Sequence, residues 1–80
     1  MANKEIKFKQ LLEVHCNENE KSKTVIQVVR WGKNAPTLEK RNYFMKDDEW
    51  LCGKACGFTR KDFKRCLKHK DEILELLTEE

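Results

Sequence analysis

A change of periodicity at Thr59 constrains the fold of this chain more than any other feature. Before Thr59, short runs alternate apolar and polar residues, which is the pattern of β-strands. After it, apolar residues recur at three- and four-residue spacing, as on one side of a helix. They are Phe63, Cys66, Leu67, Ile73, Leu74 and Leu77, with Lys70 interrupting the stripe and a polar stretch at 68–72 that permits a bend. Thr59 and Asp62 together resemble a capping box, which marks the start of a helix.

Four strand-like runs precede this helix, at residues 6–15, 24–31, 39–46 and 50–58. Turn-forming segments separate them at 17–22, 32–36 and 46–49. The alternation of the first run breaks near Leu11, which predicts an irregularity there, and the glycines of the fourth run allow a bulge or a close backbone approach. We therefore expect one α+β domain over residues 1–80: a four-stranded antiparallel sheet followed by a C-terminal helix that covers one face.

The alternation also divides the side chains between two faces of the predicted sheet. Gln27 shares a face with Trp31, and Arg41 shares a face with Tyr43, whereas Phe44 points to the opposite side. One of the two adjacent aromatics should lie in the core, and we expect Tyr43, on the Arg41 face, to be the exposed one. A single helix covers one face, so the other is available for the basic and aromatic residues.

Charge is concentrated in the middle of the chain. Residues 23–70 carry thirteen basic and five acidic side chains, a net charge of +8, whereas residues 71–80 carry five acidic side chains and no basic ones. Such a basic segment suits an anionic partner. Aromatic residues lie within it, and bases stack on aromatic rings while phosphates pair with Lys and Arg, so the pattern favours a single-stranded nucleic acid.

The four cysteines allow a second reading. Cys52, Cys56, Cys66 and His69 are ligand types that bind zinc, which would make the chain a small zinc-binding module for protein contacts. On a regular strand, however, Cys52 and Cys56 would lie about 13 Å apart, too far for one metal ion. Cys66 also falls on the apolar stripe of the helix, where free cysteine acts as a small hydrophobe. We therefore favour reduced structural thiols and expect no cofactor.

The chain also resembles a known family over residues 23–77. The pieces that carry the resemblance are the second strand ending in Trp31, the loop to Pro36, the run from Leu38 through Arg41 to Phe44, the acidic turn, and Lys54 followed by 57–59 and the helix with Phe63. In this order and spacing they resemble the single-stranded-DNA-binding domain of the transcriptional coactivator positive cofactor four (p15), especially its short bacterial relatives.

The resemblance implies two subunits that pair through their helices, and sheets that form grooves for single-stranded DNA or RNA. It implies a role in transcription or DNA maintenance. Carried over by position, the implied nucleic-acid contacts are Gln27, Trp31, Lys33, Arg41, Tyr43, Phe44 and Lys54. Lys40 departs from the pattern because relatives have an apolar residue there, and this departure bears on the register of the third strand.

Other classes of function find little support in the sequence. It contains no paired acid and base, no nucleophile motif and no phosphate-binding glycine loop, so we expect no enzymatic activity. No apolar run reaches the ~18 residues that a membrane helix requires, and no signal-peptide core opens the chain. We expect a cytoplasmic protein, or a nuclear one in a eukaryotic cell. A chain of this size has a thin core, for which pairing into a homodimer is a common remedy.

Overall fold

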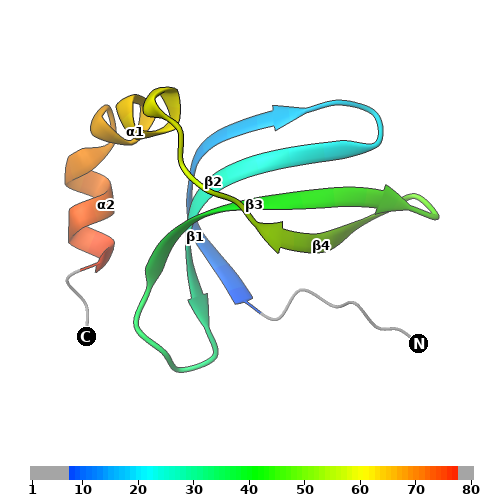
Figure 1. Ribbon diagram of the computed structural model, residues 1–80. Coiled ribbons are helices and arrows are strands. Elements are labelled where there is room, and N and C mark those ends of the chain that lie inside the picture. Colours follow the sequence, from blue (N-terminus) through cyan, green and yellow to red (C-terminus); the bar gives the residue numbers. More distant parts are fainter. Residues whose placement is uncertain (1–7, 78–80) are drawn as a thin grey trace.

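The computed structural model describes residues 8–77, which form an antiparallel sheet followed by two helices (Figure 1). The strands are β1 (Phe8–Glu18), β2 (Ser22–Trp31), β3 (Thr37–Lys46) and β4 (Glu49–Ala55), and the helices are α1 (Arg60–Leu67) and α2 (Lys70–Leu77). Each strand pairs with its neighbour in the chain, in the order β1-β2-β3-β4. The predicted α+β order of a four-stranded antiparallel sheet and C-terminal helical structure is confirmed.

Short polar turns set the register of the hairpins. Asn19 closes the β1–β2 turn, because its side-chain oxygen accepts hydrogen bonds from the backbone amides of Lys21 and Ser22, each at 2.9 Å. Asp47 and Asp48 form the two-residue β3–β4 turn, with φ angles of 53° and 64°. Positive φ at both positions is the geometry that matches the twist of a hairpin, and Asp tolerates it better than most residues.

The irregularity predicted near Leu11 is confirmed, and it changes which face the side chains of β1 occupy. Phe8 pairs with Trp31 and Gln10 with Val29, but the next pair is Leu12 with Val28. The extra residue is a β-bulge. Leu11 and Leu12 consequently both pack toward the helices, although adjacent strand residues normally point to opposite faces. Phe8, which pairs with Trp31, and Leu12, which pairs with Val28, therefore lie on opposite faces of the sheet.

The core lies between the sheet and the helices. Ile26 and Val28 of β2 pack with Cys66 of α1 and Ile73 of α2, and all four are at least 94% buried. Partly buried side chains from β1, β3 and α2 surround this cluster. In Figure 1 the helices accordingly lie together to one side of the curled sheet.

The helical part differs from the single helix that we expected. Thr59 and Asp62 do form a complete capping box at the start of α1. After Leu67, however, the amide of Lys68 donates to Arg65 and that of His69 to Cys66, and α2 begins anew at Lys70. These shorter-range hydrogen bonds tighten the backbone and end α1. The break falls in the polar stretch 68–72, and it lets α2 turn down beside the sheet (Figure 1).

The fourth strand is shorter than the predicted run 50–58. It ends at Ala55 because the chain must leave the edge of the sheet to reach the cap of α1, and only the amide of Cys56 still donates to the Lys40 carbonyl, at 2.7 Å. The expected close approach occurs at Gly53, where a β-carbon would stand 2.8 Å from the Asn42 carbonyl oxygen. The β3–β4 register shifts at this point, between Arg41 and Tyr43.

Lys40 forms an ion pair that the sequence pattern did not predict. Its ammonium lies 2.6 Å from the Asp62 carboxylate, and the side chains are only 17% and 7% exposed. The same carboxylate accepts the Thr59 amide in the capping box, at 2.8 Å. Hydrogen bonds from Lys40 and Thr59 lower the pKa of Asp62 from 3.8 to about 2. Lys40 therefore joins the middle of β3 to the beginning of α1, and it does so on the helix side of the sheet.

Candidate nucleic-acid interface

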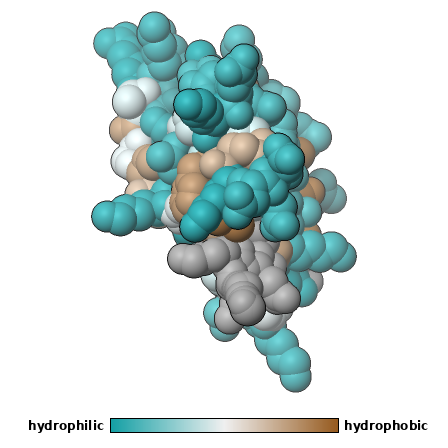
Figure 2. All heavy atoms as spheres, turned by 90° about the vertical axis from the view of Figure 1, so that its right-hand side faces the viewer, coloured by the Kyte–Doolittle hydropathy of each residue, from teal (hydrophilic) through white to brown (hydrophobic). Residues whose placement is uncertain are grey.

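Aromatic rings from all four strands meet on the sheet face that points away from the helices. They are Phe8 of β1, Trp31 of β2, Tyr43 of β3 and Trp50 of β4, and we call this surface the aromatic face. Phe8 and Trp31 pack with their ring centres 4.9 Å apart and their planes tilted by 57°. Figure 2 views the molecule from the end where the β1–β2 and β3–β4 turns lie, and it shows apolar surface bordered by hydrophilic side chains.

Two basic side chains of the aromatic face lie over these rings. The Arg41 guanidinium lies 5.3 Å from the centre of the Trp31 ring and 5.8 Å from that of Phe8. The Lys23 ammonium lies 4.6 Å from the Trp50 ring and 5.3 Å from Tyr43. These distances fall within the ~6 Å at which a cation is attracted to a ring face. The face therefore holds two clusters, each of one cation and two rings.

A buried amide links the two clusters. The Gln27 side chain is 0% exposed, and its Nε2 donates to Glu39 and to the Tyr43 hydroxyl, both at 2.9 Å. Its Oε1 accepts from Gln10 Nε2 at 2.7 Å and lies 3.2 Å from the Tyr43 hydroxyl, which donates to it. Burial raises the pKa of Tyr43, so the hydroxyl keeps its proton. Gln27 lies on the predicted face, where it positions its neighbours from beneath the surface.

Glu39 holds the Arg41 side chain in place. Its Nε and Nη2 donate to the two carboxylate oxygens at 2.8 and 3.1 Å, and Nη1 donates to the Gly53 carbonyl at 2.8 Å. Burial by itself would raise the pKa of Glu39, but hydrogen bonds from Arg41 and Gln27 outweigh it and lower that pKa. The hydrogen bond to Glu39 in turn raises the pKa of Arg41. With three nitrogens engaged, the guanidinium is fixed in place against Trp31.

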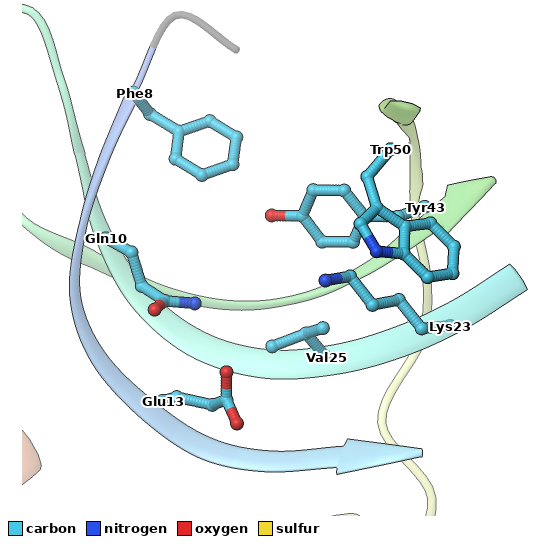
Figure 3. Close-up of a pocket in the computed structure, with 7 residues that line it drawn as sticks. All are labelled: Phe8, Gln10, Glu13, Lys23, Val25, Tyr43 and Trp50. Atoms are coloured by element: carbon cyan, nitrogen blue, oxygen red, sulfur yellow. The ribbon is translucent and has the colours of Figure 1, made fainter. Parts of the chain in front are cut away.

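A pocket of about 310 Å³ opens on the aromatic face (Figure 3). β1 and β2 form one side, and the hairpin of β3 and β4 forms the other. Its lining residues are Phe8, Gln10, Glu13, Lys23, Val25, Tyr43 and Trp50. Figure 3 shows the Gln10 amide, the Glu13 carboxylate, the Lys23 ammonium and the Tyr43 hydroxyl pointing toward the middle of this space. Gln10 and Glu13 share the face despite their odd spacing because the β1 bulge adds a residue between them.

The remaining predicted residues divide between the two faces and the loops. Lys33, in the β2–β3 loop, and Lys54, on β4, are exposed. Phe44 is 41% exposed and lies on the other face from Tyr43, as alternation predicts. Tyr43 is only 5% exposed, although we expected it to be the more accessible ring. The reason is that the curled strands and their own side chains enclose the aromatic face.

Sequence reasoning missed Phe8, Lys23 and Trp50. Two of them had a usable signal. Lys23 is an even number of positions from Gln27 and Trp31, so strand alternation places it on their face. A two-residue turn at 47–48 places Trp50 opposite Met45, and hence on the Tyr43 face. Phe8 had none, because its face depends on the bulge. Trp50 follows the acidic turn 47–49, which would repel phosphate, so the sequence favours a packing role for it. In the structure it is half-buried at the pocket wall.

The cysteines are free thiols placed on different parts of the molecule. Cys52 lies 3.6 Å from Arg41 Nη1 at the aromatic face, whereas Cys66 is in the core beneath α1. Burial raises the pKa of the Cys66 thiol, so it stays protonated. Within residues 8–77, no group of three or more His, Cys, Asp or Glu side chains is arranged to hold a metal ion.

Comparisons with models of protein families, with curated proteins and with solved structures found no match to this chain. Neither helix in the described part of the chain has the length and apolar character needed to cross a bilayer.

Proposed function

We propose that this protein is a non-catalytic binder of single-stranded DNA or RNA with weak sequence preference. The observation that carries the proposal is the aromatic face, where Trp31 and Trp50 lie beside the cations Arg41 and Lys23. Stacking on aromatic rings is tolerant of sequence because every base has a π-face, and it contributes about 1–3 kcal/mol per base. The order of sequence pieces, which resembles that of the positive cofactor four family, supports the same ligand.

The contacts divide by how free each side chain is. Trp31 and Trp50 are half-buried and serve as stacking surfaces at the two ends of the face. Lys33 and Lys54 are exposed and pair with phosphates. Arg41, held by Glu39 and Gly53, keeps the Trp31 ring in position and adds positive potential. Gln27 and Tyr43 support the surface from below.

The protein acts as a homodimer in this proposal. Phe63, Leu67 and Leu74 are 60%, 50% and 57% exposed, although they belong to the apolar stripe of the helices. Cys66 and Ile73 of the same stripe are in the core, so the helices turn only part of their apolar surface toward the sheet. A second copy that packs against the three exposed side chains would remove them from water, at about 1.5–3 kcal/mol for each fully buried side chain. The pair would then present two aromatic faces to one strand.

Fluorescence anisotropy tests the binding directly. A labelled oligonucleotide of about 15 residues, single-stranded or duplex, is titrated at several salt concentrations. We expect tighter binding of the single strand and a linear fall of log affinity with log salt, with a slope near −0.7 for each phosphate contacted. Lys54→Ala should reduce that slope, whereas Trp31→Ala should lower affinity at every salt concentration. Affinity that ignores salt, or a preference for duplex, would refute the proposal.

Tryptophan fluorescence locates the site. Trp31 and Trp50 are both on the aromatic face, so neither serves as a reference for the other. Trp31→Phe and Trp50→Phe each leave one reporter. Quenching of both reporters by an unlabelled single strand is expected, and quenching of neither would place the ligand elsewhere.

A further inference from the structure

We propose that the pocket between β1 and the β3–β4 hairpin takes up one nucleobase and prefers guanine, with Glu13 as the specificity-determining residue. The inference rests on the proposed binding of single-stranded nucleic acid and names the base that this site selects. The chemistry of this pocket differs from that of the rest of the aromatic face.

The size and walls of the pocket suit a single flat ring. Its volume of about 310 Å³ stands at the lower end of the roughly 300–1,000 Å³ typical of ligand pockets. Phe8 and Trp50 supply aromatic surface on opposite sides, and Val25 is apolar (Figure 3). An unstacked base fits such a space, because aromatic and apolar walls replace the neighbours with which it stacks in solution.

The polar groups of the pocket are mainly acceptors. The Glu13 side chain is exposed, and within residues 8–77 its carboxylate has neither a hydrogen bond nor an ion pair. Gln10 donates its amide nitrogen to Gln27, which leaves its carbonyl oxygen to accept. The Tyr43 hydroxyl is already bonded to Gln27. A carboxylate repels phosphate, so the group that enters is the uncharged base, and that base must bring donors.

Guanine has the edge that matches these groups. Its N1–H and its amino group lie side by side and can donate to the two oxygens of one carboxylate. Its O6 accepts, and lysine donates to this oxygen in many protein–DNA contacts. Lys23 supplies that donor from the same pocket. Adenine and cytosine offer one amino group next to an acceptor. Thymine offers a single N–H between two carbonyl oxygens, and those oxygens would face the carboxylate unfavourably.

Lys23 must move for a base to stack fully on Trp50. In the free protein its ammonium lies over the Trp50 and Tyr43 rings, at 4.6 and 5.3 Å. An attraction of this kind at a partly exposed site is weak, about 0.5–1 kcal/mol, so a stacking base can displace it. The released ammonium is then free to reach guanine O6.

Three oligonucleotides of about 15 residues test the inference by fluorescence anisotropy with the full chain. One is oligo-dT, the second has isolated deoxyguanosines separated by pairs of thymidines, and the third has deoxyinosine in place of each deoxyguanosine. Deoxyinosine lacks only the amino group. Isolated guanines avoid four-stranded structures. We expect the guanine oligonucleotide to bind about tenfold more tightly than oligo-dT, and about three- to tenfold more tightly than its inosine counterpart.

Two variants assign the preference to Glu13. Glu13→Gln keeps the shape of the side chain but replaces one acceptor with a donor, so the difference between guanine and inosine should disappear. Glu20→Gln, in the β1–β2 turn outside the pocket, makes the same change of charge and should retain it. Equal binding of all three oligonucleotides by the unmutated protein overturns the inference and leaves the proposed function standing. A guanine preference that survives in Glu13→Gln overturns the role of Glu13, and failure to bind any single strand overturns both proposals.

Discussion

Replacing Gln27 with leucine separates a positioning role from a ligand contact. Leucine has a similar volume and suits a 0% exposed site, but it removes the hydrogen bonds that Gln27 makes to Gln10, Glu39 and Tyr43. The three partners differ in how well water can replace the hydrogen bond that each one loses. Gln10 is exposed and can turn to water, whereas the Glu39 side chain is only 13% exposed and Tyr43 only 5%, so water replaces their lost hydrogen bonds poorly.

The cost follows from those two partners. Tyr43 is 5% exposed, and an unsatisfied buried hydroxyl costs about 1–3 kcal/mol. Glu39 keeps its two bonds from Arg41 but loses one charge-assisted bond, which is worth about 1.5–3 kcal/mol. The apolar leucine offsets part of this. We expect the free energy of unfolding to fall by about 2–4 kcal/mol, which corresponds to roughly 8–30 °C in Tm for a chain of this length.

Urea denaturation followed by tryptophan fluorescence measures this loss. Asn42→Ala is the matched control on the same sheet, because it removes one exposed hydrogen bond to Thr24 and should cost about 1 kcal/mol or less. Where Gln27→Leu is still folded, its oligonucleotide affinity should change little at low temperature. Unchanged stability together with a tenfold loss of affinity would show that Gln27 contacts the ligand, and would refute the reasoning.

Three further predictions concern the frame that holds the site. Asp62, whose pKa is lowered to about 2, should stabilise the fold above about pH 4 and lose that contribution as pH falls toward 2. Urea titrations of Asp62→Asn across this range should lack this part of the pH dependence. The same change of stability with pH in the variant and the unmutated protein would contradict this prediction. Gly53→Ala should cost about 1–3 kcal/mol in the same denaturation assay because its methyl group meets backbone, whereas Gly57→Ala, with open space around it, should cost less than about 1 kcal/mol. Leu67→Glu should convert the proposed dimer to a monomer in sedimentation, and Lys64→Glu on the same helix should not; a Leu67→Glu protein that still sediments as a dimer would exclude this interface.

Local chemistry made much of the fold predictable. The β-branched run of β2, the turn residues around Asn19 and Asp48, and the capping box at Thr59 each act over a few residues, so their signals are in the sequence. Alternation likewise placed Gln27, Arg41 and Tyr43 on one face. The end of β4 and the division of the helix were missed, because both depend on how the chain turns from the sheet edge to the core.

The amino-acid sequence was enough to decide which side chains of β2 share a face and which of β3 do, because the two-residue period of a strand sets this within each strand. What those residues do depends on contacts that form only when the chain folds. The β1 bulge moved Phe8 and Glu13 to the pocket, and strand curvature buried Gln27 and Tyr43 while leaving Trp50 at the wall. Lys40 pairs with Asp62, which lies 22 residues away in the sequence. Pairing register, curvature and distant ion pairs arise from contacts between segments, which local patterns do not encode.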